Sequence, residues 1–106
     1  MSKAAAEYEK LVARLRGTPG VAAGQMFGKA CLKINGKAFV AQHRDTVVFK
    51  LSGTAREEAL SLPGAVLWDP SGRGHPMKEW IALPEGQSKN YGPFANAALE
   101  YASATA

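Results

Sequence analysis

The chain of 106 residues has a single cysteine and no long apolar run, and each shortage excludes a class of structure. Cys31 alone cannot form a disulfide within the chain, which agrees with a reducing compartment. Apolar runs of only a few residues are too short to span a bilayer. The opening stretch MSKAAAEYEK lacks the apolar centre of a signal peptide. We therefore expect a cytoplasmic protein that does not enter a membrane.

Metal-ligand side chains are also scarce. Cys31, His43 and His75 are the soft ligand types in the chain, and they do not form the local pairs, such as Cys-x-x-Cys, from which zinc sites are built. The hydrophobic pattern also accounts for the chain without a bound group. We therefore expect no metal site and no organic cofactor.

Two arrangements are open to a catalytic interpretation, and each has a structural alternative. Cys31 could be a nucleophile with a distant histidine as its base, or a small buried residue of a strand, where free cysteines are usually found. Asp69 and His75 could form an acid–base pair across a loop, or Asp69-Pro70 could simply start a turn. The segment GKACLKINGK lacks the spacing of a phosphate-binding loop. Because no nucleophile elbow or carboxylate pair is present, the sequence predicts that the protein is not an enzyme.

What the chain does have is apolar material and an uneven charge. At 46 % hydrophobic it can fill one core, so residues 1–106 are predicted to form a single domain. The net charge is +4, but residues 10–50 hold eight basic side chains and one acid, Asp45, for +7, and the rest of the chain sums to −3. This basic front half is a candidate surface for phosphates or an acidic partner. The alternative is that the lysines keep a sheet edge soluble.

Helical spacing occurs at both ends of the chain. One apolar stripe consists of Tyr8, Leu11, Val12 and Leu15. It predicts a helix over 3–16 that the segment GTPG ends. A closing helix is predicted from about Asn90, with Pro93 in its first turn.

The segment 21–51 has the short apolar runs of strands. Asn35-Gly36 suits the positive φ values of a type I′ turn between two paired strands. A second tight turn in HRDT then gives a meander of three strands, with QMFG as a candidate fourth. With Asn35 and Gly36 at the turn, Ile34 opposes Lys37, Leu32 opposes Phe39 and Cys31 opposes Val40. This register puts Leu32, Ile34, Phe39 and Ala41 on one face and Cys31, Ala38 and Val40 on the other.

The second half of the chain predicts one short helix and two strands. Thr54 and Glu57 have the spacing of a capping box, which starts a helix in TAREEALSL. AVLW is typical of a strand, and MKEWIAL of another in which Met77, Glu79 and Ile81 alternate with Lys78, Trp80 and Ala82. The glycines and prolines of the loop between them indicate a shaped connection. The predicted fold is α+β, a single antiparallel meander sheet with helices at both termini and one short helix between strands.

Aromatic side chains could make a base-stacking platform on such a sheet. The aromatic residues in or next to the meander are Phe27, Phe39 and Phe49. Aromatic residues of a small sheet are more often part of the core, and that is the interpretation we favour.

Two long segments resemble the TfoX-type N-terminal domain family, small bacterial proteins related in name to a regulator of natural competence. They are GQMFGKACLKINGKAFVAQHRDTVVFKL and LPGAVLWDPSGRGHPMKEWIALPEG. The matching features are the Met26-Phe27-Gly28 turn, the Asn35-Gly36 hairpin, the Phe49-Lys50-Leu51 strand and the Gly74-His75-Pro76-Met77-Lys78-Glu79-Trp80 segment. The resemblance covers nearly the whole chain. It implies a compact α+β domain of the MmcQ/YjbR-like group of folds, and it supplies no catalytic residues and no assigned activity.

These observations together favour a regulatory or interaction module that binds a protein through its basic surface, with weak, non-specific nucleic-acid binding as a secondary property. We expect a monomer or a weak homodimer, without sequence-specific DNA binding because no base-reading element is apparent. The expected contact residues are basic: Lys29, Lys33, Lys37, Arg44, Arg73, His75 and Lys78. In the hairpin register above, Lys37 lies on one face of the sheet and Lys29 and Lys33 on the other. The alternative is a small enzyme or ligand-binding domain that uses the loop at 69–80.

Overall fold

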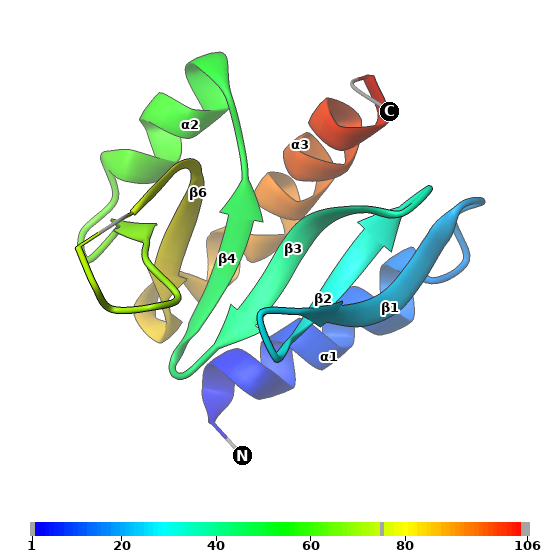
Figure 1. Cartoon of the computed structure of the whole chain (residues 1–106), viewed down its shortest axis with the longest axis horizontal. Coiled ribbons are helices and arrows are strands. Elements are labelled where there is room, and N and C mark those ends of the chain that lie inside the picture. Colours follow the sequence, from blue (N-terminus) through cyan, green and yellow to red (C-terminus); the bar gives the residue numbers. More distant parts are fainter. Residues whose placement is uncertain (1, 75, 105–106) are drawn as a thin grey trace.

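A computed structural model, which describes residues 2–74 and 76–104, shows an α+β fold built on one antiparallel sheet (Figure 1). The elements in chain order are α1 (Lys3–Leu15), β1 (Val21–Met26), β2 (Lys29–Ile34), β3 (Lys37–His43), β4 (Thr46–Lys50), α2 (Gly53–Leu60), β5 (Val66–Trp68), β6 (Met77–Pro84), the 3-10 helix η1 (Glu85–Asn90) and α3 (Tyr91–Ala104). The predicted α+β class, with terminal helices and one short helix between strands, is confirmed.

The six strands lie in the order β1-β2-β3-β4-β6-β5. The first four form the predicted meander, because each is joined to the next by a tight turn. The chain then leaves through α2 and returns as β5 at the outer edge, and β6 fills the place between β5 and β4. The two outer strands of the sheet are therefore β1 and β5.

Helices cover only one face of the sheet. Figure 1 shows α1 and α3 behind the strands, and both helices pack on β3 and β4. Between them and the sheet lies the main core. Its largest fully buried side chains are Tyr91, Phe39, Phe49, Leu32, Leu51, Ile81, Leu83, Val40 and Val47. Burial of each such side chain contributes about 1.5–3 kcal/mol, so this face accounts for most of the hydrophobic stabilisation.

The helix starts agree with the sequence-based prediction except at the N-terminus of α2. At the start of α1, the Ser2 hydroxyl oxygen accepts a hydrogen bond from the backbone N–H of Ala5 at 3.0 Å. Helix α2 begins at Gly53 with Ser52 as its N-cap, and no side chain caps it. The predicted capping box of Thr54 and Glu57 is therefore wrong, because Thr54 already lies inside the first turn.

The hairpin of β2 and β3 has the predicted turn but a different register. Ile34 pairs with Lys37 and Lys33 with Ala38, and then the register shifts so that Leu32 pairs with Val40. The extra residue is Phe39, which makes a β-bulge. The expected pairing of Leu32 with Phe39 is therefore wrong.

The bulge changes the side of the sheet to which two residues belong. Phe39 and Val40 are consecutive, yet both are fully buried in the main core. Ala41 consequently lies on the helix-free face, opposite Cys31, although it was expected beside Leu32. Burial of two large apolar side chains instead of one outweighs the local loss of ladder hydrogen bonds.

A second register shift affects β6. Leu67 pairs with Ile81, but the next residue of β5, Trp68, pairs with Met77. Met77 therefore packs on the helix-free face with Trp80, and the expected alternation that grouped Met77 with Ile81 is wrong. Glu79 stays on the helix side, where its carboxylate accepts a hydrogen bond from the Tyr101 hydroxyl.

None of the helices in the described part of the chain combines the length and the apolar character needed to cross a membrane.

Candidate interaction surface

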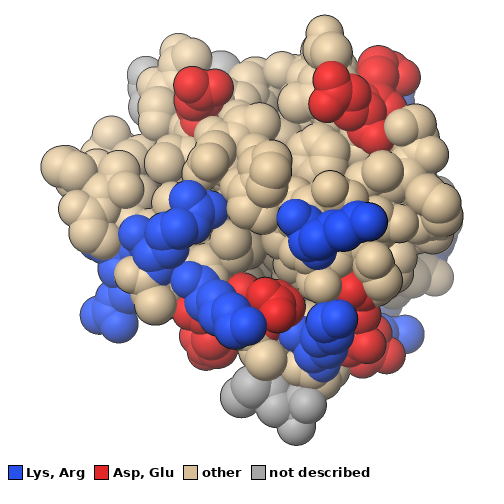
Figure 2. All heavy atoms as spheres, turned by 180° about the vertical axis from the view of Figure 1, so that it is seen from behind, with Lys and Arg blue, Asp and Glu red and all other residues tan. Residues whose placement is uncertain are grey.

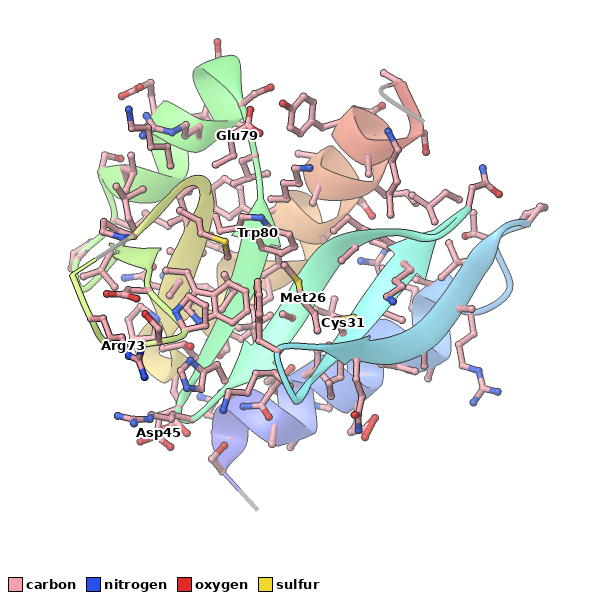
Figure 3. The ribbon with its side chains drawn as sticks, viewed as in Figure 1. Met26, Cys31, Asp45, Arg73, Glu79 and Trp80 are labelled. Carbon is pink, nitrogen blue, oxygen red and sulfur yellow. The ribbon has the colours of Figure 1, made fainter. Side chains whose placement is uncertain are left out.

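The helix-free face of the sheet carries a second, smaller hydrophobic cluster. Its buried members are Cys31, Ala41, Val48, Trp68, Trp80 and Ala82, with Met26, Ala38 and Met77 packed against them. Figure 3 shows Trp80, Met26 and Cys31 following one another across the middle of this face, in front of the strands. No helix in the described part of the chain covers this cluster, so its own aromatic side chains shield its smaller members from solvent.

Four rings form what we call the aromatic patch: Phe27, His43, Trp68 and Trp80. Trp68 is at its centre, with ring centroids 6.2 Å from Phe27, 5.9 Å from His43 and 5.6 Å from Trp80. The contacts with Phe27 and His43 are edge-to-face, and aromatic pairs of this kind contribute about 0.5–1.5 kcal/mol each beyond their buried area. The two tryptophans are buried, whereas Phe27 is 62 % exposed.

Phe27 occupies a backbone position that disfavours it. In the β1–β2 turn, Phe27 and Gly28 have φ of 53° and 74°; in the β2–β3 turn, Asn35 and Gly36 have 50° and 85°. Positive φ at both residues is the geometry of type I′ hairpins, for which asparagine and glycine are the preferred residues. A phenylalanine there stores roughly 1 kcal/mol of backbone strain, and its ring remains largely in solvent.

Arg44, in the β3–β4 turn, also has a positive φ, of 55°. Among the described residues other than glycine, positive φ occurs at three positions: Phe27, Asn35 and Arg44. Two of these three adjoin Trp68, since Phe27 contacts its ring and Arg44 shares a hollow with it. One of these strained positions is therefore in the aromatic patch and another is beside it, and strain of this kind is common at binding and catalytic sites.

His43 contacts Trp68 in the patch and also lies close to two basic side chains. The Trp68 indole N–H donates a hydrogen bond to His43 Nδ1 at 2.8 Å, so the neutral ring carries its proton on Nε2. Burial lowers the pKa of His43, and the positive charges of Lys29 and Arg44 lower it further. His43 is therefore neutral at physiological pH, and two cations lie close enough to affect it.

A hollow of about 260 Å³ opens beside the patch. It is lined by His43, Arg44, Thr46, Val66, Leu67, Trp68, Asp69 and Ala82. Most of this lining is apolar, and Val66 is 57 % exposed. The hollow therefore has an apolar floor with Arg44 and Asp69 among its polar groups.

The loop that follows β5 is organised by Asp69. Its carboxylate accepts hydrogen bonds from the Ser71 hydroxyl at 2.9 Å and from the backbone N–H groups of Gly72 at 3.0 Å and Gly74 at 2.8 Å. Both glycines have positive φ, 68° and 81°, as the sequence predicted for a shaped loop. The candidate acid–base pair of Asp69 with His75 involves a residue outside the described part of the chain. The three hydrogen bonds to Asp69 hold the loop in shape, which is a structural role.

The predicted contact residues do not form one surface. Lys29 follows the Phe27-Gly28 turn on the helix-free face, and Arg44 follows His43 and lines the hollow beside Trp68. Lys33 lies on the same helix-free face, with its side chain across Gly24. Lys37 is paired with Ile34 and so shares the face that the helices cover. Lys29 and Lys33 are thus separated from Lys37 by the sheet.

The other predicted contacts belong to the loop and β6. Arg73 is exposed in the loop, and Lys78 is exposed at the start of β6, where its backbone carbonyl accepts a hydrogen bond from Arg56 at 2.7 Å. His75 lies outside the described residues. On the helix side, basic side chains lie among acidic ones (Figure 2), for example Lys10 at 3.1 Å from Glu7.

Cys31 is fully buried between strands. Burial raises the pKa of its thiol, and the opposing effect of Lys33 is smaller. The thiol is therefore protonated at neutral pH, which favours the structural interpretation over a nucleophile. Across residues 2–74 and 76–104, no three side chains of His, Cys, Asp or Glu are grouped in a way that could hold a metal ion.

Sequence reasoning located the cations but missed the aromatic patch. Phe39 and Phe49 are core residues, as expected, but Phe27 is not. The signal was present, because Met26-Phe27-Gly28-Lys29 repeats the turn pattern of Ile34-Asn35-Gly36-Lys37 with phenylalanine in place of asparagine. The contact of this turn with Trp68 can be predicted only when the position of β5 in the sheet is known. No local sequence pattern predicts that position.

No protein-family model matches the chain, and no similar curated protein or solved structure was found.

Proposed function

We propose that this protein is a small interaction module that binds a partner protein through the aromatic patch and the cations beside it. The observation that carries the proposal is Phe27, an exposed aromatic side chain held at a strained turn position against Trp68. The fold alone does not need a phenylalanine there, because the neighbouring hairpin makes the same turn with asparagine. Packing on Trp68 offsets the strain, and binding a partner supplies a reason for the exposure of the ring.

The composition of the surface favours a protein partner over nucleic acid. Aromatic and arginine side chains are typical anchors of protein interfaces. Here Phe27 is exposed against Trp68, and Val66 is exposed in the hollow that Arg44 also lines. A platform for single-stranded nucleic acid needs several exposed rings in a row. In the patch, both tryptophans are buried and the indole N–H of Trp68 is already used by His43. Nucleic-acid binding is therefore proposed as weak, non-specific and sensitive to salt.

The hollow beside Trp68 supports a second candidate function, the binding of a small ligand. Its volume of about 260 Å³ is just below the range of drug-sized sites. A planar or branched apolar group with an acidic substituent would match its apolar floor and Arg44. The ligand would then lie at the base of the loop, beside β5, and not along the loop itself.

We also propose that the chain is related to the TfoX-type N-terminal domains that its two long segments resemble. A regulatory role in a bacterial cell would suit a small module that acts through a partner. The fold class agrees with what the resemblance implies, and the assignment to that family remains our proposal.

The test is quantitative affinity capture from an extract of the source cells, followed by mass spectrometry. The baits are the wild-type chain, the double variant Phe27→Asn/Val66→Ser, and the helix-side control Lys10→Glu. We expect a defined set of proteins that is retained by wild type and the control and is lost with the double variant. Equal capture by all three baits would contradict the proposal. A small molecule that stabilises the wild-type chain, together with no specific protein capture, would favour the second candidate.

A further inference from the structure

The two outer strands of the sheet differ in how well they are protected against pairing with another strand. Strand β5 has three residues, a register shift against β6, and Asp69-Pro70 directly after it. Strand β1 has six residues, VAAGQM, with no charged residue and no proline. Short length, irregular pairing and proline protect a sheet edge. By length, pairing and proline, β5 is protected and β1 is not, and the charge along β1 comes from Lys33 of the neighbouring strand.

The free side of β1 offers backbone hydrogen-bonding groups. Pairs in an antiparallel ladder alternate between bonded and non-bonded, and the bond from Asn35 N–H to the Gly20 carbonyl at 2.9 Å fixes the alternation. Even-numbered residues of β1 therefore point their backbone groups at β2. Ala23 and Gln25 point theirs away from the sheet, whereas the Val21 N–H is already bonded to the Thr18 carbonyl.

Lys33 places a positive charge along this edge. Gly24 has no side chain, and the Lys33 side chain of the neighbouring strand crosses it: the Lys33 Cε, Cδ and Nζ atoms lie 3.4, 3.6 and 3.8 Å from where a Cβ on Gly24 would stand. The Lys33 ammonium group therefore lies above β1 on the helix-free face. Lys29, four residues earlier in β2, lies on the same face at the Phe27 end of the strand.

We propose that β1 is a docking edge that adds one extended, acidic strand from a partner to the sheet. The proposal rests on the proposed function and specifies how the partner binds. Backbone groups of the partner pair with Ala23 and Gln25, and glutamates or aspartates on its helix-free side meet Lys33 and Lys29. Its alternate side chains, on the helix side, lie beside Val21, which packs on the main core, so they are β-branched and apolar.

Charge decides between a partner and a second copy of this chain. Two copies joined along β1 would bring two Lys33 ammonium groups to the same seam, and each chain has a net charge of +4. An acidic strand turns this repulsion into attraction. We therefore commit to an acidic partner segment, and self-association is one outcome of the test.

The test uses an acetylated and amidated peptide, Thr-Glu-Val-Glu-Val-Glu-Thr, titrated into the whole chain. Its counterpart with lysine for every glutamate is the control peptide. Chemical shifts and hydrogen exchange of the backbone amides report the site. We expect the acidic peptide to bind and to slow exchange at the Ala23 and Gln25 amides, and the lysine peptide to do neither.

Three variants separate edge binding from binding elsewhere on the face. Ala23→Pro removes an outward N–H, which an edge strand tolerates, and should weaken the acidic peptide more than tenfold. Lys33→Glu should weaken it about fivefold to tenfold, since one rim charge is reversed, and should admit the lysine peptide. The helix-side variant Lys10→Glu should change affinity less than about twofold, because that side chain is exposed on α1, on the opposite side of the sheet from Lys33 and Lys29.

The variants distinguish a failure of the docking edge from a failure of the proposed function. Peptide binding that survives Ala23→Pro but is lost in Phe27→Asn would overturn the docking edge and leave the aromatic patch as the binding surface. The absence of peptide binding at millimolar concentration would also overturn it. Concentration-dependent dimers with slowed exchange at Ala23 and Gln25 would show that the edge pairs with a second copy instead.

Discussion

Replacing Phe27 with asparagine should lower the stability of the fold only modestly, by about 1 kcal/mol. Because Phe27 is 62 % exposed, roughly 60–100 Å² of its apolar surface loses contact, which costs about 1.5–2.5 kcal/mol. Asparagine relieves roughly 1 kcal/mol of strain at positive φ. The expected net loss in the free energy of unfolding is therefore about 1 kcal/mol. The substitution also reproduces the Asn35-Gly36 turn of the neighbouring hairpin.

Urea denaturation followed by tryptophan fluorescence measures this difference, since Trp68 and Trp80 both lie in the patch. The matched control is Phe39→Asn, in which a fully buried ring of the main core is lost. That variant should lose about 3–5 kcal/mol or fail to fold. A loss above about 3 kcal/mol for Phe27→Asn would show that the ring is a structural element, and its strained position would then need no partner to account for it.

Further substitutions test other parts of the structure. Burial, and then Glu85, raise the pKa of Tyr91 from 10.0 to about 12, so the unfolded chain loses this proton first and stability should fall as pH rises above 10. Tyr91→Phe should reduce that alkaline loss in a pH series of urea melts without abolishing it, because burial also raises the pKa of Tyr8 and of Cys31. It should cost about 1–2 kcal/mol at neutral pH, because two backbone carbonyls lose its hydroxyl. The pKa of His43 is lowered from 6.5, so the unfolded state takes up the proton first and stability should fall as pH drops below that value; His43→Gln should flatten this part of the profile. Gly64 has φ of +83°, and a Cβ there would stand 2.8 Å from Pro84 Cγ, so thermal melts of Gly64→Ala should show a loss of about 2 kcal/mol or more. Gly28→Ala, with φ of +74° and open space, should lose only about 1 kcal/mol.

The fold class could be predicted because its signals are local. The stripe from Tyr8 to Leu15 and the Asn35-Gly36 turn each specify one element without reference to the rest of the chain. The bulge at Phe39 could not be predicted in the same way. It depends on whether two consecutive large side chains both find room under α1 and α3, which is a property of the assembled core.

The candidate site was predicted only in part, for a related reason. Charge is visible in the sequence, so Lys29 and Arg44 were among the expected contacts. These cations lie near the hydrogen bond between His43 and Trp68, which joins residues 25 positions apart in the chain. That contact depends on the strand order, in which β6 lies between β4 and β5. Alternation within single strands carries no information about that strand order.

The most direct test of the binding surface is site-specific photocrosslinking in the source cells. The photoreactive residue p-benzoylphenylalanine replaces Phe27 in one chain and Lys10, on the exposed helix side, in another. We predict a discrete crosslinked partner from position 27 and none from position 10. A partner crosslinked from position 10 and not from position 27 would contradict the assignment of the helix-free face as the interaction surface.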